Sequence, residues 1–409
     1  MVTPASPRTA AWARGLAFLR GRDITGAQFA VLVGGFLVNV GSFSVYPYVA
    51  VLLRERMGVG MAQVGVVLGL ATLVQFASAP ATAAVAERVG LQRSLVAALV
   101  LYGLGGGAFL AGGENPVLTI AGLFLISGGG SLYSPAYRSY LLHGVSNEQR
   151  PRLVSAGNAA GSLGIAVGPV VGAVLIQRPG EMFAVVTAVY ASLAIGHVFL
   201  RREQRTEDAP PVEPFRRMLH GLAVLPFVVT ALTFYLHMQF FQYLSSYAQG
   251  RVTTLLFGVA MMGYSLGLAI VQPMVAQRVE RMSYPAAIGI GFGCLAAGMV
   301  AFAGANGFTV VVGVASISVG SAVLFLKNDL EALARSRRSA TVVFGQQRLA
   351  VGVGSFLSGV VGGAVYGLFE RGGYLPGFWL VVAAQCLLFP VVVLAVRRLH
   401  GSTPAATLS

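Results

Sequence analysis

The stretch Val85-Ala86-Glu87-Arg88-Val89 returns in altered form as Val275-Ala276-Gln277-Arg278-Val279, 190 residues further along the chain. The same offset aligns Gly164 with Gly354 and brings other glycines of the two regions into register. Self-similarity at a fixed, long offset is the sequence signature of a duplicated fold. We therefore expect two structurally related halves.

The composition of the chain is that of an integral membrane protein. Of its 409 residues, 56% are hydrophobic and 10% are charged, and the mean hydropathy is +0.75. Soluble domains carry about a quarter charged residues. Because a helix needs about 20 apolar residues to cross a bilayer, the chain has room for roughly twelve spans. The composition and the repeat together predict an all-α membrane protein with six transmembrane helices in each half.

Apolar runs that are long enough to cross a bilayer divide the chain into two predicted bundles. The predicted spans are 27–53, 61–84, 93–112, 116–141, 153–176 and 181–200, then 222–247, 253–276, 284–304, 308–333, 342–368 and 376–396. We expect a cytoplasmic lead-in (1–26), an N-terminal bundle (27–200), a cytoplasmic linker (201–221), a C-terminal bundle (222–398) and a cytoplasmic tail (399–409). The linker is polar and contains Pro210-Pro211, which favours a connection between domains.

Arginine is unevenly distributed between alternate connections. One set holds Arg54, Arg56, Arg178, Arg251 and Arg371, whereas twenty arginines lie in the other set, which includes both terminal segments. Since cytoplasmic loops hold the excess of positive charge, both termini are predicted to be cytoplasmic. The net charge of +14 is explained in the same way, and no basic patch with interleaved aromatic residues indicates nucleic acid binding.

The two cysteines, Cys294 and Cys386, both lie inside apolar runs. Small buried side chains are the interpretation we favour for them. The sequence therefore indicates no disulfide framework, no metal site and no cofactor.

The connection after the second predicted span reads Ala83-Ala84-Val85-Ala86-Glu87-Arg88-Val89-Gly90-Leu91-Gln92-Arg93. It resembles the Gly-x-Leu-Ala-Asp-Arg-x-Gly-Arg-Arg loop of the major facilitator superfamily, although Ala83 replaces the first glycine. In that family the acidic residue caps a helix end and pairs with arginine. The resemblance implies that Glu87, Arg88 and Arg93 take part in a cytoplasmic gate. It also implies the major facilitator fold of two pseudo-symmetric six-helix bundles.

The fifth predicted span contains Gly164-Ile165-Ala166-Val167-Gly168-Pro169-Val170-Val171-Gly172-Ala173. This is similar to the Gly-x-x-x-Gly-Pro-x-x-Gly-Gly motif of antiporters in that superfamily, with Ala173 in place of the last glycine. Glycines at this spacing form a flat face for close helix packing, and proline permits a bend. We assign Gly164, Gly168, Pro169 and Gly172 to helix packing, and the resemblance implies export.

The fourth predicted span contains Gly128-Gly129-Gly130-Ser131, and Asn147-Glu148-Gln149-Arg150 follows it. Both stretches resemble the corresponding parts of twelve-span drug/proton antiporters. Such antiporters carry an arginine before the glycine cluster, where this chain has Phe124 and Leu125. The overall resemblance still implies exchange with protons. The arginine that would support this role is absent from the chain at that position.

Five charged residues fall within the predicted spans, where charge is costly and functional residues are expected. They are Arg138, Lys327, Asp329, Glu331 and Arg348. The repeat aligns Arg138 with the neighbour of Asp329, so we hypothesise that Arg138 forms an inner gate with Asp329 or Glu331. The alternative is a local pair between Lys327 and Glu331, four residues apart, that only neutralises the helix end.

Polar side chains at mid-membrane depth are the candidates for substrate binding. In the superfamily that this chain resembles, the first, fourth, seventh and tenth helices line a central cavity. Our candidates there are Asn39, Tyr46, Tyr133, Tyr235, His237, Gln239 and Gln242. Tyr235, Gln239 and Gln242 share a helix face, and such a surface suits an amphipathic organic molecule. Anchoring at the membrane interface is the alternative for Tyr46 and Tyr48.

The candidates for proton coupling are Asp329, Glu331 and His237. Histidine titrates near neutrality, which suits a proton carrier. A hydrogen-bonded residue within helix packing is the alternative interpretation of His237.

These observations predict a secondary transporter that exports amphipathic organic molecules, such as drugs or natural products, in exchange for protons. A proton-coupled importer or facilitator of a small nutrient would use the same fold. An enzyme and an ATP-driven transporter are both disfavoured, because we find neither a catalytic constellation in the spans nor a phosphate-binding loop. We expect a monomer in the bacterial inner membrane whose partners are a small-molecule substrate, protons and the lipid bilayer, without nucleic acid.

Overall fold

The computed structural model describes residues 24–113, 115–146, 148–201 and 219–401. Within these ranges all regular secondary structure is helical, which confirms the predicted all-α class. The predicted lead-in (1–26), linker (201–221) and tail (399–409) lie largely outside the described residues.

The N-terminal half contains eight α-helices and one short 3-10 helix in its described residues. They are α2 (Gly26–Val45), η1 (Tyr46–Tyr48), α3 (Val49–Met57), α4 (Met61–Ala77), α5 (Ala79–Val89), α6 (Leu91–Gly112), α7 (Pro116–Leu142), α8 (Arg150–Leu175) and α9 (Pro179–Val198). Helices α2, η1 and α3 together form the first span, and α4 with α5 forms the second.

The C-terminal half repeats this order with one π-helix. Its described elements are α11 (Val224–Ala248), α12 (Thr254–Arg281), α13 (Tyr284–Phe302), α14 (Gly307–Arg335), α15 (Ala340–Leu357), η2 (Ser358–Gly362), α16 (Gly363–Arg371) and α17 (Pro376–Gly401). Over the described residues, eleven helical segments are long and apolar enough to span a membrane, and the bent pair α4 and α5 makes twelve.

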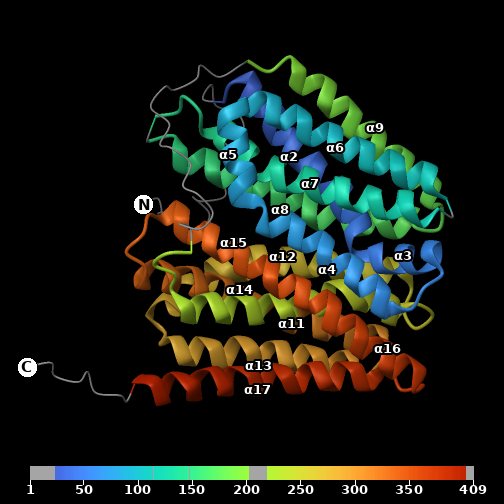
Figure 1. Cartoon of the computed structure of the whole chain (residues 1–409), viewed down its shortest axis with the longest axis vertical. Coiled ribbons are helices and arrows are strands. Elements are labelled where there is room, and N and C mark those ends of the chain that lie inside the picture. Colours follow the sequence, from blue (N-terminus) through green and yellow to red (C-terminus); the bar gives the residue numbers. More distant parts are fainter. Residues whose placement is uncertain (1–23, 114, 147, 202–218, 402–409) are drawn as a thin grey trace, which may run out of the picture.

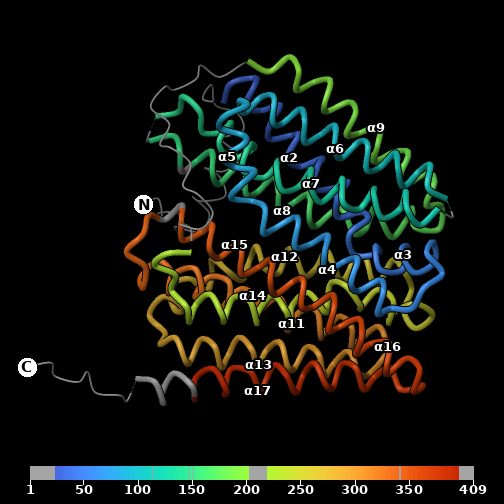
Figure 2. Tube along the Cα trace, viewed as in Figure 1, coloured from blue at the N-terminus to red at the C-terminus, as the bar shows by residue number. Residues whose placement is uncertain are grey.

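The two halves form two layers of helices, blue to green and yellow to red in Figures 1 and 2. Across the boundary, α4 packs along α15 and η2, while α8 packs along α12. We call one end of the bundle the α3 end and the opposite end the α5 end, after the helices seen there in Figure 1. Apolar side chains such as Val117, Met274 and Phe308 are exposed on the outside, as a lipid-facing surface requires.

Local sequence signals set many of the helix ends. Thr25 and Gln28 form a capping box at the start of α2, and Asn306 with Thr309 forms another at the start of α14. Helix α3 ends at Gly58, whose φ of 62° is a backbone conformation that glycine adopts at little cost.

Three predicted spans depart from a single straight helix. The second span bends by 49° between α4 and α5, where Pro80 lacks the N–H that a continuous helix would use. The first span is interrupted by η1, which contains Pro47. The eleventh span widens into the π-helix η2, which the apolar pattern does not predict.

Candidate functional site

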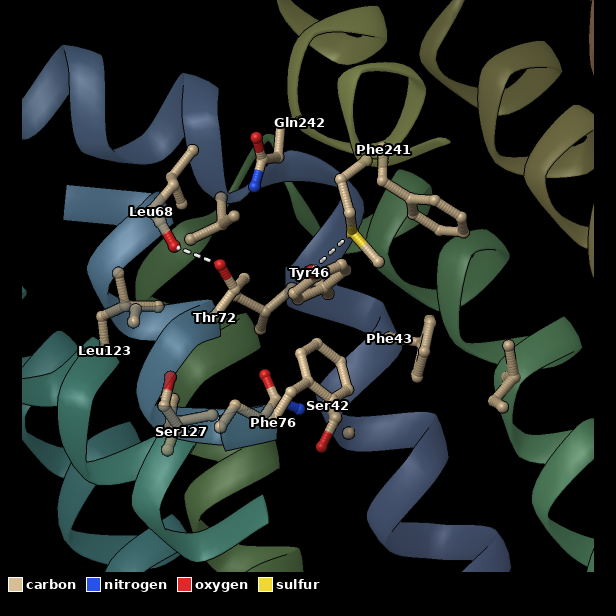
Figure 3. A pocket seen from close by; sticks show the side chains of 18 of the residues that line it. Ser42, Phe43, Tyr46, Leu68, Thr72, Phe76, Leu123, Ser127, Phe241 and Gln242 are labelled. Carbon is tan, nitrogen blue, oxygen red and sulfur yellow. Dashed lines mark hydrogen bonds between the residues drawn. The ribbon is translucent and has the colours of Figure 1, made fainter. Parts of the chain in front are cut away.

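A cavity of about 400 Å³ lies between the two halves. Both halves line it: α2, α4 and α9 contribute residues from one side, and α11, α12 and α14 contribute from the other. Figure 3 shows several of these side chains, with Tyr46 and Thr72 from the N-terminal half lying across the space from Phe241 and Gln242 of α11.

The cavity wall is aromatic and uncharged. Its aromatic residues are Phe43, Tyr46, Phe76, Tyr102, Phe109, Phe183, Tyr190, Phe234, Phe241, Tyr264 and Phe325, and its amide residues are Gln75, Gln242 and Gln272. Among the described residues that line it, none is Asp, Glu, Lys or Arg. Because such a wall offers ring faces and hydrogen bonds but no full charge, it suits an uncharged molecule with aromatic surface.

Several hydroxyl groups in the wall already have partners within the protein. The Thr72 hydroxyl lies 3.0 Å from the carbonyl oxygen of Leu68 and 2.9 Å from that of Gly69, to which it donates. Tyr46 donates across the two halves to the sulfur of Met238, at 3.5 Å. The hydroxyls of Thr72 and Tyr46 are therefore directed at protein atoms.

His237 lines the cavity and is 3% exposed. Its Nε2 lies 3.2 Å from the hydroxyl of Tyr264, and its Nδ1 lies 3.2 Å from the hydroxyl of Ser321. Phe241 and Phe325 contact the ring, with centroid distances of 5.2 Å and 5.3 Å. Since a hydroxyl can donate or accept, these two groups can satisfy both ring nitrogens in either tautomer of the imidazole.

Gln242 also lines the cavity and is 3% exposed. Its Oε1 accepts a hydrogen bond from Ser358 in η2 at 3.2 Å. Its buried Nε2 has no hydrogen-bond partner within the described part of the chain. In Figure 3 this amide nitrogen is directed toward the space beside Thr72 and Tyr46.

Four of the seven predicted binding residues lie outside the cavity wall, which departs from the sequence prediction. Asn39 donates to the carbonyl of Gly35 within α2. Tyr133 stacks on Tyr137, which also belongs to α7, with a distance of 5.7 Å between the ring centroids. Tyr235 donates to Gln385 of α17 at 3.0 Å.

Gln239, the fourth of these residues, lies beside η2. Tyr235, Gln239 and Gln242 share a face of α11, but of these three residues Gln242 alone lines the cavity. Helix α11 is buried on nearly all sides, so helical spacing alone could not show which side faces the cavity.

The wall also takes residues from the second, third, fifth, sixth and eighth spans, which the sequence does not predict. Thr72 and Gln75 of α4 and Gln272 of α12 line the cavity. A glutamine within an otherwise apolar span was the available signal, because a buried amide requires partners or a role.

The two halves meet closely at the α3 end. Arg54 of α3 forms an ion pair with Glu370 of α16, and Gln249 donates to Glu55 at 3.2 Å. The side chains of Arg54 and Glu370 are 41% and 27% exposed. These contacts join opposite halves.

A glycine contact lies deeper, between α4 and η2. A Cβ atom on Gly65 would overlap the carbonyl oxygen of Gly359, and one on Gly359 would overlap the backbone of Gly65 and Gly69. Tyr243 of α11 donates to the same carbonyl of Gly359 at 2.8 Å. The backbones of the two halves therefore touch directly here.

A similar contact joins α8 to α12. Tyr48 donates to the carbonyl of Pro169 at 2.8 Å, and a Cβ on Gly258 would lie 2.7 Å from both this oxygen and the Cβ of Ala173. Another face of α8 packs within its own half.

Gly164, Gly168 and Gly172 form that other face of α8. A Cβ atom on any of the three would overlap atoms of the first span. The predicted packing residues therefore lie at two contacts of α8. The three glycines pack against the first span, and Pro169 packs against α12 of the other half.

The predicted gate residues lie toward the α5 end. Glu87, Arg88 and Arg93 are exposed there, at and after the end of α5. Arg348 of α15 interacts electrostatically with Asp329 of its own half and with Arg138 of the other half. Within the described residues, no ion pair within 4 Å links Arg138 to Asp329 or Glu331.

Glu331 and Lys327 do not pair with each other, which contradicts the alternative of a local Lys327–Glu331 pair. Glu331 pairs with Arg335, whose Nε lies 2.7 Å away. The ammonium group of Lys327 donates to the carbonyls of Glu280 at 3.1 Å and Met282 at 2.6 Å. Those carbonyls lie at the end of α12, where a cation is stabilised by the helix dipole.

Comparison with known proteins gives a family match and several partial relatives. The sequence pattern of the Major Facilitator Superfamily matches residues 31–327. Multidrug resistance protein MdtH of Salmonella arizonae is 25% identical over 212 residues, which cover 51% of this chain and 52% of MdtH. The Yersinia enterocolitica MdtH is 26% identical over 212 residues, with 51% and 53% covered. The chain thus spans about half the length of the curated relatives it matches.

Solved structures share the fold along most of the chain. The nucleoside transporter NupG matches with a TM-score of 0.74 and 12% identity, covering 91% of this chain and 100% of NupG. The human organic anion transporter MFSD10 matches with a TM-score of 0.63 and 18% identity, covering 90% and 98%. A POT family transporter in complex with 5-aminolevulinic acid matches with a TM-score of 0.74 and 10% identity, covering 90% and 95%. At these identities the likeness shows the fold alone.

Proposed function

This chain belongs to the major facilitator superfamily, and from that premise we propose that it exports uncharged, amphipathic aromatic molecules by alternating access, in exchange for protons. The observation that carries the proposal is the cavity between the halves, lined by aromatic, amide and hydroxyl groups without Asp, Glu, Lys or Arg among its described lining residues. Similarity to proteins named for multidrug resistance supports the direction of transport.

The positions of the contacts between the halves support the first step of export. The ion pair of Arg54 with Glu370 and the contact of Gly65 with Gly359 hold the α3 end together. The distribution of arginine favours a cytoplasmic location for the α5 end and for both termini. We infer that this conformation receives substrate from the cytoplasm and that the α3 end opens in the next step.

We infer that the inner gate closes when the α5 ends of the two halves approach. Arg138 would then come close to Asp329, next to Arg348, and Glu87, Arg88 and Arg93 would support the closure from α5. In the present conformation Arg348 already lies within electrostatic range of both Asp329, which attracts it, and Arg138, which repels it.

Proton exchange would use His237 in the cavity wall and Asp329 near the gate. His237 is held between two hydroxyl groups that can reorient with its protonation state. Glu331 is the weaker of the three predicted carriers because it is ion-paired with Arg335 on the same helix turn.

Everted membrane vesicles that contain the protein test this proposal, with the neutral fluorophore Nile red as the probe. An imposed proton gradient, acidic inside, is expected to drive Nile red into the lumen, and His237→Gln is expected to abolish the part that depends on the gradient. His143→Gln, which alters a histidine outside the cavity wall, is the matched control. Nile red uptake that ignores the gradient would instead favour the facilitator, and accumulation driven in the opposite direction would favour the importer.

A further inference from the structure

We propose that Gln242 is the specificity-determining residue of the cavity, donating a hydrogen bond from Nε2 to a neutral acceptor, such as a carbonyl, on an uncharged aromatic ligand. This inference rests on the proposed function in one respect only, since it assigns the ligand to the same cavity. It adds the chemical group that the ligand must carry.

The amide nitrogen of Gln242 is unpaired in the part of the chain that the structure describes. Gln242 is 3% exposed, and its Nε2 has no partner within the described residues, although its Oε1 is hydrogen-bonded. Buried polar groups are nearly always paired, and an unpaired one is destabilising. An acceptor on a bound ligand would satisfy this nitrogen.

The side-chain amide of Gln242 is also fixed in orientation. Ser358 donates to Oε1 at 3.2 Å, so Nε2 is left directed at the cavity. Tyr243 in turn donates to the carbonyls of Ser358 at 3.3 Å and Gly359 at 2.8 Å, and thereby holds the π-helix that carries the serine. Ser358 is therefore a positioning residue that acts through Gln242.

Gln242 differs from the neighbouring hydroxyl donors in the cavity wall. Thr72 and Tyr46 face the same space in Figure 3, but their hydroxyls donate to backbone carbonyls and to the sulfur of Met238. Gln242 supplies a donor of this group that is already desolvated and oriented. Because none of the described lining residues is Asp, Glu, Lys or Arg, a neutral acceptor is favoured over a carboxylate.

Three rigid tricyclic compounds of similar shape test the proposal on the purified full chain in detergent. Fluorenone carries a carbonyl acceptor, carbazole carries an N–H donor, and fluorene carries neither. Binding is measured by calorimetry for the wild type and for Gln242→Leu. The preference for fluorenone over fluorene is expected to fall about tenfold in the variant, as the loss of one buried hydrogen bond predicts. Partition of each ligand into the micelle cancels in this comparison of ratios.

Two further variants separate recognition from packing. Gln239→Leu changes a buried amide on the same helix outside the cavity wall and should leave the preference intact. Ser358→Ala should reduce the preference without changing the affinity for fluorene, because it frees the orientation of Gln242. Thermal unfolding of each variant establishes that it is folded.

The proposal is overturned if Gln242→Leu weakens the binding of all three compounds equally, if carbazole is the preferred ligand, or if the wild type binds none of them. These outcomes do not depend on transport. If the vesicle experiment fails while the fluorenone preference persists, then the direction or the coupling is wrong and the recognition by Gln242 stands.

Discussion

The carbonyls of Pro169 in α8 and Gly359 in η2 occupy equivalent places in the two halves, 190 residues apart, and each meets the opposite half. Each accepts a hydrogen bond at 2.8 Å from a tyrosine of its own half's first span, Tyr48 or Tyr243. Each also lies against a glycine of the other half's second span, Gly258 or Gly65. The two halves therefore make equivalent contacts, although the helices that carry the two carbonyls differ in backbone conformation.

The difference is in the helix that carries the carbonyl. At Pro169 the chain remains α-helical, whereas at Gly359 it widens into a π-helix whose serine also reaches the cavity through Gln242. Single π turns inside α-helices are frequently found at functional sites. We infer that both contacts close the α3 end, but that the C-terminal contact alone is linked to the ligand site.

The largest effect is expected for Gly359→Ala. Its new methyl group would meet backbone atoms of Gly65 and Gly69, which cannot move aside as a flexible side chain can. Overpacking costs about 1–3 kcal/mol, so the closed α3 end should become roughly tenfold less populated. Initial rates of Nile red transport measure the loss.

Variants of two other glycines serve as comparisons for Gly359→Ala. Gly258→Ala alters the equivalent contact at Pro169 and should also slow transport. Gly367→Ala adds a methyl group whose nearest neighbour would be 3.9 Å away, and it should behave as wild type. If Gly359→Ala transported Nile red at the wild-type rate, the contact between Gly359 and Gly65 would not be needed to close the α3 end.

A smaller effect is expected for the two tyrosines. Tyr243→Phe removes a donor shared by the carbonyls of Ser358 and Gly359, whereas Tyr48→Phe removes a donor to Pro169 alone. Each lost hydrogen bond contributes about 1 kcal/mol, so Tyr243→Phe should lower the melting temperature more. It should also weaken the fluorenone preference, which Tyr48→Phe should not. Equal effects of both variants on that preference would remove the distinction between the halves.

The smallest effect is expected for the ion pair of Arg54 with Glu370. Both side chains are partly exposed, and such pairs contribute about 0–1 kcal/mol. Glu370→Gln should therefore change transport rates less than threefold, by an amount that shrinks as salt is added. The reversed pair, Arg54→Glu with Glu370→Arg, should recover what either reversal loses. A severe defect in Glu370→Gln that persists at high salt would show that the ion pair carries more of the closure than we assign to it.

Much of the fold follows from apolar length, arginine placement and the repeat. These features predict the spans and their order, because backbone groups in a bilayer must be satisfied within helices. The bend at Pro80 has a visible sequence cause. The π-helix at Ser358 has no visible sequence cause; in the structure its Gly359 packs against the α4 helix of the other half.

The binding site was predicted less completely than the fold. His237 and Gln242 line the cavity, but Gln239 does not, although it is a polar residue on the same buried helix. Thr72 and Gln75 are not predicted because the family resemblance places the wall on the first, fourth, seventh and tenth spans, and these two residues lie on the second. Which side of a buried helix faces a cavity depends on the rotation of that helix among its neighbours, which one sequence does not encode locally.

Alternating access requires the cavity to face each end of the bundle in turn, and distances between spin labels at both ends of the bundle measure this. Labels at Val117 and Phe308 report on the α3 end, and labels at Val89 and Phe344 report on the α5 end; all four side chains are exposed. With fluorenone and a proton gradient in proteoliposomes, the distance at the α3 end should lengthen while the distance at the α5 end shortens. Distances that stay fixed at both ends, or that lengthen at both ends together, would contradict alternating access.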